Sequence, residues 1–263
     1  MKLGILIPLK AKQVARNWSI TCACLEQTLR SIEAQTSPEW EAIVVGHDKP
    51  DFLDSGRFKT QFSGLGTSPP TPPPHAYRKV DWDWIRARAV DRNSKIIRGM
   101  QLLRDKGIDY WYYLDGDDLL HKRFVETLMS MDLQAGATLH EGYLWYPRNR
   151  RVIPYSNMPI ICGSTVVIRS SDVEVPETLE LSEWRKVPFC SYNHREIARY
   201  FEEEHNGKYV PVAERLLAYS VGHGDNTSDG FRDTPIKRLK AWAKPYILGR
   251  KIDQSFIRDF SLS

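Results

Sequence analysis

The first half of the chain alternates between short apolar runs and longer segments with helical spacing. Residues 3–9, 42–45 and 110–114 are continuous apolar runs, as is typical of strands buried on both faces of a parallel sheet. Residues 19–34 and 91–105 carry apolar side chains three and four positions apart, which predicts helices. Strands and helices that alternate in this order predict a right-handed parallel α/β sheet.

The second half of the chain mixes the two patterns. We expect a helix at 124–131, strands at 138–145 and 164–169, a helix at 194–205 and a strand within 214–223. Residues 51–84 are irregular, with a proline-rich tract that predicts a surface loop and a weaker strand pattern at 57–62. The chain is therefore expected to form one α/β domain over residues 1–235, with a mainly parallel central sheet flanked by helices and a smaller mixed second half.

Three aspartates follow the apolar run at 110–114, namely Asp115, Asp117 and Asp118. Ligands of open parallel sheets bind beyond the carboxyl ends of the strands, where these residues fall. Adjacent carboxylates repel one another unless they are protonated or neutralised by a cation. Hard oxygen ligands favour Mg²⁺ or Mn²⁺, which keep coordination positions for water and substrate phosphate. The cluster thus predicts a metal site for a phosphorylated ligand.

The C-terminal segment 236–263 is basic and amphipathic. Its residues 236–251 hold six Lys or Arg and no acid, interleaved with Leu239, Trp242 and Tyr246. Two interpretations stay open: a tail that lies on an anionic membrane surface, or a terminal helix that packs its apolar stripe on the domain. The net charge of the whole chain is +4, which is too mild to indicate a nucleic-acid partner.

Composition and cysteine usage favour a cytoplasmic protein. The chain is 41% hydrophobic and 27% charged, as is typical of soluble globular proteins. Its four cysteines lack metal-ligand spacing and are interpreted as reduced thiols. The N-terminal apolar run lacks a cleavage site, and no stretch reaches the ~20 apolar residues that span a bilayer. Peripheral contact with the inner face of the membrane through the tail stays open.

The order of these features resembles the nucleotide-sugar glycosyltransferases of the GT-A fold, in particular family 2-like enzymes. The matching segments are the first strand ending in Ile7-Pro8, "IVVGHDKPD", "DRNSKIIRGMQLLRDKGIDYWYYLDGDDLL", "ICGSTVVIRSS" and "YSVGHGDNTS". The resemblance spans about residues 3–228, and the DGDD block with its preceding strand is its specific part. It implies a GT-A fold, with a donor-binding half at about 1–120 and an acceptor half at about 121–235.

The resemblance also implies an activity and a donor site. Such enzymes move a sugar from a nucleotide-diphosphate sugar, most often UDP-linked, to a saccharide or lipid-linked acceptor. Pro8 ends the first strand at the donor site, and Asp48 would read the nucleotide base. Arg92 and Lys95 would approach the phosphates, and Asp115 would face the sugar-nucleotide.

Metal and acid–base roles follow from the same resemblance. Asp117 and Asp118 would hold Mn²⁺ or Mg²⁺ on the diphosphate, and His223 would complete the metal shell. Family 2 enzymes usually take their general base from an acid at the start of a helix in the second half. Here that helix begins "YNHREIARYF", so the base is left open between His194, Glu196 and Glu183. The anomeric outcome and the oligomeric state are left open as well.

Two other classes of function fit part of the pattern. A haloacid dehalogenase-type phosphatase would use the DxD of "DGDD" and the "GDNTSD" at 224–229. That family places its first motif on the first strand, whereas a complete strand–helix–strand unit comes earlier here. A non-catalytic nucleotide- or sugar-binding module would bind through the same acids without turnover.

Overall fold

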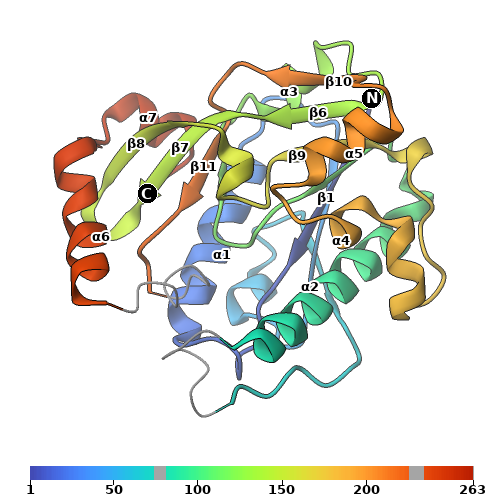
Figure 1. Cartoon of the computed structure of the whole chain (residues 1–263), viewed down its shortest axis with the longest axis horizontal. Coiled ribbons are helices and arrows are strands. Elements are labelled where there is room, and N and C mark those ends of the chain that lie inside the picture. Colours follow the sequence, from blue (N-terminus) through green and yellow to red (C-terminus); the bar gives the residue numbers. More distant parts are fainter. Residues whose placement is uncertain (74–80, 225–233, 263) are drawn as a thin grey trace.

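The structure, a computed structural model, describes residues 1–73, 81–224 and 234–262. Its larger sheet (Figure 1) holds, in spatial order, β10 (Tyr209–Val212), β6 (Gly136–Leu139), β9 (Val166–Arg169), β4 (Tyr110–Tyr113), β1 (Leu3–Pro8), β2 (Trp40–Gly46) and β3 (Gln61–Gly64). Strand β9 runs antiparallel to β4 and β6, and the other neighbours pair in parallel. The expected α/β class with a mainly parallel central sheet is confirmed.

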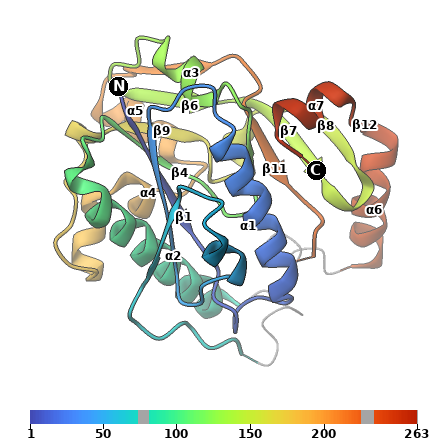
Figure 2. The same cartoon turned by 180° about the vertical axis from the view of Figure 1, so that it is seen from behind.

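Different helices cover the two faces of the larger sheet (Figures 1 and 2). Helix α1 (Trp18–Glu33) lies on one face and α2 (Trp82–Leu103) on the other. Ile5 of β1 belongs to the buried cluster on the α1 side, and its neighbour Leu6 to the cluster on the α2 side. Successive side chains of a strand point to opposite faces, so β1 must be apolar at both odd and even positions. This explains its uninterrupted apolar run.

A second, smaller sheet stands beside the first. It holds, in spatial order, β12 (Arg250–Lys251), β8 (Arg151–Ser156), β7 (Glu141–Tyr146), β11 (Leu217–Ser220) and β5 (Leu119–Leu120). Strand β11 pairs in parallel with β7, and the other neighbours are antiparallel. Because β5 directly follows Asp118, the aspartate cluster lies where the chain passes from the larger sheet to the smaller one.

The remaining elements are mostly short. The helices are α3 (Phe124–Met129), α4 (Pro188–Ser191), α5 (Ile197–Glu204), α6 (Pro235–Leu248) and α7 (Gln254–Asp259). The 3-10 turns are η1 (Asp51–Ser55), η2 (Arg104–Lys106), η3 (Pro147–Asn149), η4 (Met158–Ile160), η5 (Ser170–Asp172) and η6 (Leu181–Lys186). Within the described residues, every helix is too short or too polar to cross a membrane. The four cysteines are free thiols.

The helix expected at 91–105 begins nine residues earlier, at Trp82. Its N-cap is Asp81, whose side chain accepts a hydrogen bond of 2.9 Å from the backbone N–H of Trp84. The indole of Trp84 is buried in a small cluster with Ala11 and Val14. Tertiary packing of this tryptophan thus extends the helix over a stretch whose polar residues conceal the helical pattern.

The single strand expected at 138–145 is wrong, because β6 and β7 lie in different sheets. The break falls at His140, whose carbonyl oxygen accepts hydrogen bonds from the backbone N–H groups of Asn157 and Met158. These bonds replace ladder pairing at that residue, so the chain leaves one sheet and enters the next. The strand expected at 57–62 begins later, at Gln61.

The segment expected to be a basic tail contains α6, β12 and α7. Strand β12 pairs with β8, and Phe256 and Phe260 pack in the same buried cluster as Trp145 of β7. Strand β12 therefore belongs to the second sheet, and α7 packs against that sheet. Helix α6 stands at the outer edge of the molecule (Figures 1 and 2).

Candidate functional site

A cavity of about 250 Å³ opens at the carboxyl edge of the larger sheet. Strands β1 and β4 are parallel neighbours, so the residues that follow them meet at this edge. The lining residues are Pro8 at the end of β1, Leu9, Lys10 and Val14 after it, Ile85, Arg88, Ala89, Asp91, Arg92 and Lys95 of α2, and Asp115 after β4. The cavity is thus walled by one helix and two strand ends, and its charged side chains come from three separate segments.

Four of the five expected donor-binding residues line this one cavity, namely Pro8, Arg92, Lys95 and Asp115. The fifth, Asp48, follows β2 and accepts a hydrogen bond of 2.7 Å from the backbone N–H of Lys12. That bond ties the loop after β2 to the loop after β1. The structure therefore brings the expected donor residues together, and their individual roles stay predictions.

Lys95 is part of a buried polar network behind the cavity. Its side chain is 2% exposed, and its ammonium donates a 2.5 Å hydrogen bond to Asp91. The other oxygen of Asp91 lies 2.6 Å from Nε2 of His47, the residue after β2. Burial lowers the pKa of Lys95, and the Asp91 carboxylate opposes that shift. The network fixes a cationic group against the wall of the cavity.

Asp115 lines the same cavity and is half-buried. The phenol of Tyr113 donates a short hydrogen bond to its Oδ1, and the Arg92 guanidinium lies 5.7 Å from the centre of the Tyr113 ring. Burial raises the pKa of Asp115 to about 6, and the nearby charge of Asp117 adds to this rise. Arg92 and Lys10 pull the pKa of Asp115 back down. The carboxylate repulsion inferred from the sequence is thus present in the fold.

Asp118 points into the protein and is fully buried. Its Oδ2 accepts hydrogen bonds from the Ser164 hydroxyl at 2.8 Å and the Cys162 thiol at 3.2 Å. Its Oδ1 accepts from the backbone N–H of Ser220 at 3.1 Å. Burial is the largest cause that raises the pKa of Asp118 well above its usual value. Asp118 would have to give up protein hydrogen bonds to ligate a metal, and its expected role as a ligand stays a prediction.

Asp117 and His223 converge from positions 106 residues apart. The Oδ2 of Asp117 lies 2.8 Å from Nε2 of His223. Side-chain exposure is 26% for Asp117 and 6% for His223. The carbonyl oxygen of His223 accepts a 2.8 Å bond from Arg148, which fixes the loop after β11. Asp117 follows the cavity residue Asp115 by two positions in the sequence, and neither Asp117 nor His223 lines the cavity itself.

The Asp117–His223 pair fits two neighbouring ligands of one divalent ion. Adjacent ligands of an octahedral ion with bonds of about 2.1 Å stand about 3 Å apart, close to the 2.8 Å between these two atoms. No group of three or more His, Cys, Asp or Glu side chains is placed to hold a metal among the described residues. Ions that act on phosphates commonly take one or two protein ligands and fill their shell with water and phosphate oxygens.

The three candidates for the general base lie in different surroundings. His194 is half-buried, and its Nε2 lies 3.3 Å from the carbonyl oxygen of Ile160. Burial lowers the pKa of His194, the hydrogen bond to the Ile160 carbonyl oxygen opposes that shift, and the charges of Arg195 and Arg92 lower the pKa further. Glu196 is exposed. Glu183 pairs with Lys186 at 3.0 Å.

Several residues that shape this site were missed in the sequence. Ser164 bonds to the Asp118 carboxylate and also accepts a 2.9 Å hydrogen bond from the backbone N–H of Asp115. Lys10 and Arg88 line the cavity, and Tyr113 bonds to Asp115. No sequence signal identifies these residues: Ser164 reaches the site because β4 pairs antiparallel with β9, and the register Tyr112–Val167 continues toward Asp115 and Ser164.

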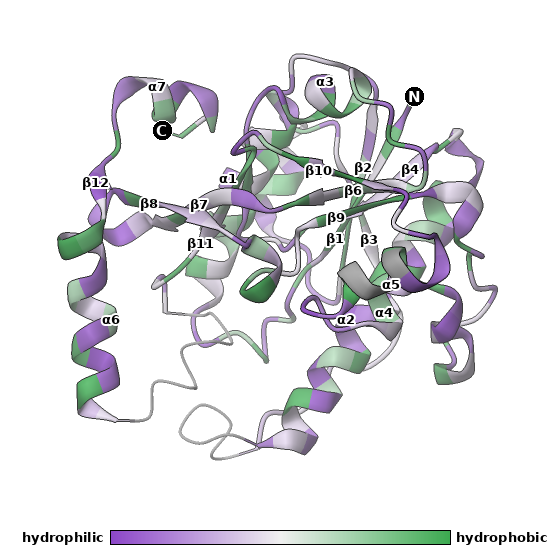
Figure 3. Ribbon diagram, turned by 45° about the horizontal axis from the view of Figure 1, so that its top comes forward, coloured by the Kyte–Doolittle hydropathy of each residue, from purple (hydrophilic) through white to green (hydrophobic). Residues whose placement is uncertain are grey.

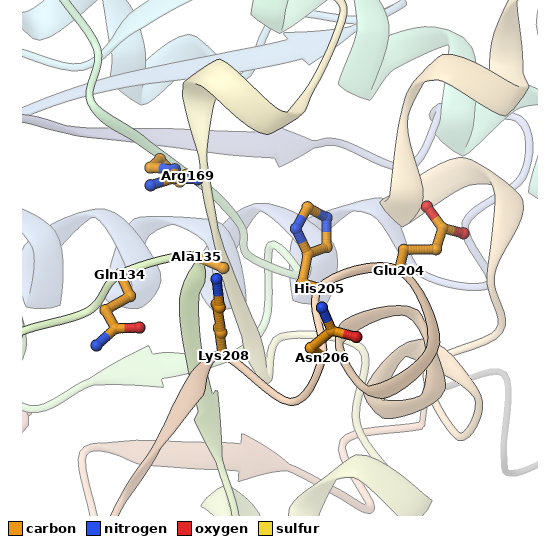
Figure 4. A pocket seen from close by; sticks show the side chains of 7 residues that line it. All are labelled: Gln134, Ala135, Arg169, Glu204, His205, Asn206 and Lys208. Atoms are coloured by element: carbon orange, nitrogen blue, oxygen red, sulfur yellow. The ribbon is translucent and has the colours of Figure 1, made fainter.

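A second cavity, of about 320 Å³, lies at the opposite edge of the larger sheet (Figure 4). Its lining residues are Gln134, Ala135, Arg169, Glu204, His205, Asn206 and Lys208. Arg169 pairs with Asp172, three residues away, at 2.8 Å. This cavity contains none of the expected site residues.

Comparisons with known proteins give likenesses of structure. No protein-family model and no curated protein matches the sequence. A crystal structure of Staphylococcus aureus TarS matches with a TM-score of 0.46 and 14% identity, over 91% of this chain and 39% of that one. A structure of TarS residues 1–349 matches with a TM-score of 0.45 and 13% identity, over 100% of this chain and 73% of that one.

A third matching structure is a Desulfovibrio desulfuricans G20 protein, provisionally assigned as a nucleotide-diphospho-sugar transferase. It matches with a TM-score of 0.40 and 10% identity, over 93% of this chain and 96% of that one. That assignment falls in the class of protein that the sequence resembles, the nucleotide-sugar transferases. The chain spans about two fifths of the first TarS structure. Scores and identities this low carry no functional argument, so we base the proposed function on the site itself.

Proposed function

We propose that this protein is a metal-dependent glycosyltransferase. It would move a sugar from a nucleotide-diphosphate sugar, with UDP as the expected carrier, to a saccharide or lipid-linked acceptor. The observation that carries the proposal is the convergence of buried and half-buried charges from distant segments at the carboxyl ends of the strands. The cations Lys10, Arg92 and Lys95 line the cavity there, and Asp117 of the DGDD turn meets His223.

The side chains match the charge changes of sugar transfer. Breaking the bond between sugar and diphosphate builds negative charge on the leaving oxygens, and cations already fixed in place stabilise that charge. Lys95 is held by Asp91, so it needs little rearrangement to act. A divalent ion held by Asp117 and His223 would neutralise further charge on the diphosphate. Asp118 would hold the turn that carries Asp115 and Asp117 in position, through the hydrogen bonds that it accepts from Ser164 and Ser220.

His194 is the general base that the surroundings favour. An acceptor hydroxyl must lose its proton as it attacks, and the base must therefore be unprotonated near neutral pH. The lowered pKa of His194 keeps its imidazole neutral there. Glu196 lies exposed, and the carboxylate of Glu183 is engaged by Lys186.

A donor-hydrolysis screen tests the proposal. The protein is incubated with UDP-, GDP-, ADP- and dTDP-linked sugars, with and without Mn²⁺, and release of the nucleoside diphosphate is measured. We expect metal-dependent release from one donor class. Metal-dependent calorimetric binding of a nucleoside diphosphate without any release would instead assign a binding module.

The phosphatase interpretation makes a different prediction. It requires Asp115 to be phosphorylated, and it relies on "GDNTSD", of which residues 225–229 lie outside the described part of the chain. A phosphatase would hydrolyse p-nitrophenyl phosphate and bind beryllofluoride in the absence of any nucleotide. Release of inorganic phosphate rather than of a nucleoside diphosphate would overturn the transferase proposal.

A further inference from the structure

Helix α6 stands at the edge of the molecule (Figures 1 and 2), and apolar residues recur along its length (Figure 3). The stripe residues, a name used below for Ile236, Leu239, Trp242, Tyr246 and Ile247, are each between 52% and 76% exposed. Trp242 and Tyr246 contact one another, with ring centroids 5.4 Å apart. Exposed apolar residues that gather on one element mark an interaction surface.

Cations border this apolar stripe. At about 100° per residue, the stripe residues fall within an arc of about 140° on the helix surface. On the same projection Lys237, Lys240 and Lys244 follow one edge of the arc, and Arg238 stands beyond the other. Pro245, on the opposite side of the helix, is buried. The stripe therefore faces away from the domain, with basic residues along both of its margins.

The helix is held in this orientation by the second sheet. Arg151 of β8 donates hydrogen bonds to the carbonyl oxygens of Pro245 at 2.8 Å and Gly249 at 2.7 Å. The Arg151 guanidinium also lies 5.6 Å from the centre of the Tyr246 ring. These contacts fix the C-terminal end of α6 on the second sheet. Tyr246, the least exposed of the stripe residues at 52%, lies at the margin that touches Arg151, and the other stripe residues are at least 63% exposed.

We propose that α6 docks the protein on an anionic lipid surface, with the stripe residues inserted among the lipids. Residues 236–251 contain six Lys or Arg and no acid, which complements acidic headgroups. Lysines at the margin of an apolar stripe reach the headgroup phosphates while the stripe enters the acyl boundary. This inference goes beyond the proposed transferase activity and does not depend on it.

A second copy of the chain fits this surface less well. A two-fold interface places the same patch on both partners. Two copies of α6 would therefore bring eight cations together without an acid from either helix, and like charges in contact oppose association. An anionic membrane supplies the opposite charge and the apolar interior at once.

Vesicle flotation tests the charge requirement. Vesicles of phosphatidylcholine with about one quarter phosphatidylglycerol should bind the full chain, and pure phosphatidylcholine should bind it weakly. The combined change Lys237→Gln, Lys240→Gln, Lys244→Gln should weaken partitioning roughly a hundredfold. The matched control changes Lys59, Lys106 and Lys208 to Gln, which are exposed lysines on other elements, and should bind within about twofold of the natural chain.

A second variant tests insertion. Leu239→Ser with Trp242→Ser should lower partitioning at least tenfold, because apolar burial drives insertion. The matched control, Trp82→Ser with Leu181→Ser, removes equally exposed apolar groups elsewhere and should bind normally. Natural-level binding by the Leu239/Trp242 variant would overturn the proposal, as would equal binding to neutral and anionic vesicles.

Sedimentation velocity without lipid tests whether a second copy of the chain, rather than a membrane, covers the α6 surface. A dimer that the Leu239/Trp242 variant dissociates, together with absence of vesicle binding, would assign α6 to self-association and overturn the membrane proposal. Point variants are preferred to deletion of 236–263, because deletion removes Phe256 and Phe260 from the second sheet's core.

Discussion

The larger sheet has one cavity at the carboxyl ends of its parallel strands and another at the opposite strand ends. The two cavities are similar in size, about 250 and 320 Å³, but the charged groups around them differ. At the carboxyl edge, Lys95 is 2% exposed and Asp115 is half-buried, and the two come from distant segments. At the other edge, the Arg169 side chain is 44% exposed and pairs with Asp172, its neighbour three residues on. Volume therefore does not distinguish the two cavities, whereas burial of charge does.

This difference separates a candidate site from an ordinary surface hollow. Arg169 is exposed even though the Asp172 side chain is only 10% exposed, and an ion pair with one exposed partner three residues away contributes little to stability. Buried like charges cost folding free energy, and they are kept where a ligand or a metal compensates for them. The raised pKa values of Asp115 and Asp118 are signs of that cost. Changes at the first cavity should thus affect function and stability together, and changes at the second should affect neither.

The largest effect is expected from Asp117→Asn. Loss of the carboxylate charge removes one half of the Asp117–His223 pair, and donor hydrolysis should fall by about a hundred- to a thousandfold, as for loss of one transition-state partner. Nucleoside diphosphate release measures it. The matched change in the second cavity, Glu204→Gln, should retain normal turnover, and equal losses in both variants would erase the contrast.

Lys95→Met should produce the largest loss of stability. It leaves Asp91 buried with one cationic partner fewer, and breaking one member of a buried pair costs about 3 kcal/mol. Urea unfolding measures it, with Lys208→Met in the second cavity as the neutral control. In a double-mutant cycle, Asp91→Asn should recover part of the loss, and strictly additive effects would show that the two residues do not interact.

How well the sequence predicts the elements around the first cavity depends on how long and continuous the hydrophobic pattern of each element is. Strands β1, β2 and β4 are continuous apolar runs, so the central sheet and the location of the DGDD turn at its carboxyl edge were predictable. The boundaries of α2 and the split between β6 and β7 were not. They depend on the packing of Trp84 and on hydrogen bonds to the His140 carbonyl oxygen, both of which are tertiary.

The orientation of individual side chains in the candidate site also depends on tertiary contacts that the sequence does not reveal. Asp117 and Asp118 are adjacent and chemically identical in the sequence, yet one stands beside His223 and the other is buried under Ser164. Which of two successive side chains faces outward depends on the turn geometry and on β9, which lies about fifty residues further on. The network of His47, Asp91 and Lys95 likewise needs the position of α2 against β2.

Metal binding should stabilise the carboxyl edge of the sheet. An ion that binds only the folded state, at a free concentration of about a hundred times its Kd, adds about 2.7 kcal/mol to the free energy of unfolding. We therefore expect Mn²⁺ together with a nucleoside diphosphate to raise the Tm, measured by thermal unfolding with and without EDTA. His223→Ala should abolish the rise. His205→Ala, at the second cavity, should preserve it, and a rise that survives His223→Ala would place the metal elsewhere.

The smallest expected effect concerns the pH dependence of the free energy of unfolding of the metal-free protein. The folded-state pKa of Asp115 is raised to about 6, above an unfolded value of about 3.9. Between these values the folded state binds more protons than the unfolded state, so the free energy of unfolding falls as pH rises from about 4 to 6. Asp115→Asn removes that slope. In EDTA the variant should gain about 2 kcal/mol over the natural chain near pH 8 and little near pH 4.

The control for this slope is an exposed acid, Asp105. Asp105→Asn should leave the dependence of the unfolding free energy on pH unchanged, since its carboxylate is solvated in both states. Urea unfolding at a series of pH values measures all three proteins. If the natural chain and Asp115→Asn give parallel curves, the Asp115 carboxylate is as well solvated as a surface acid. The electrostatic difference between the two cavities would then lie in Lys95 and Asp118 rather than in Asp115.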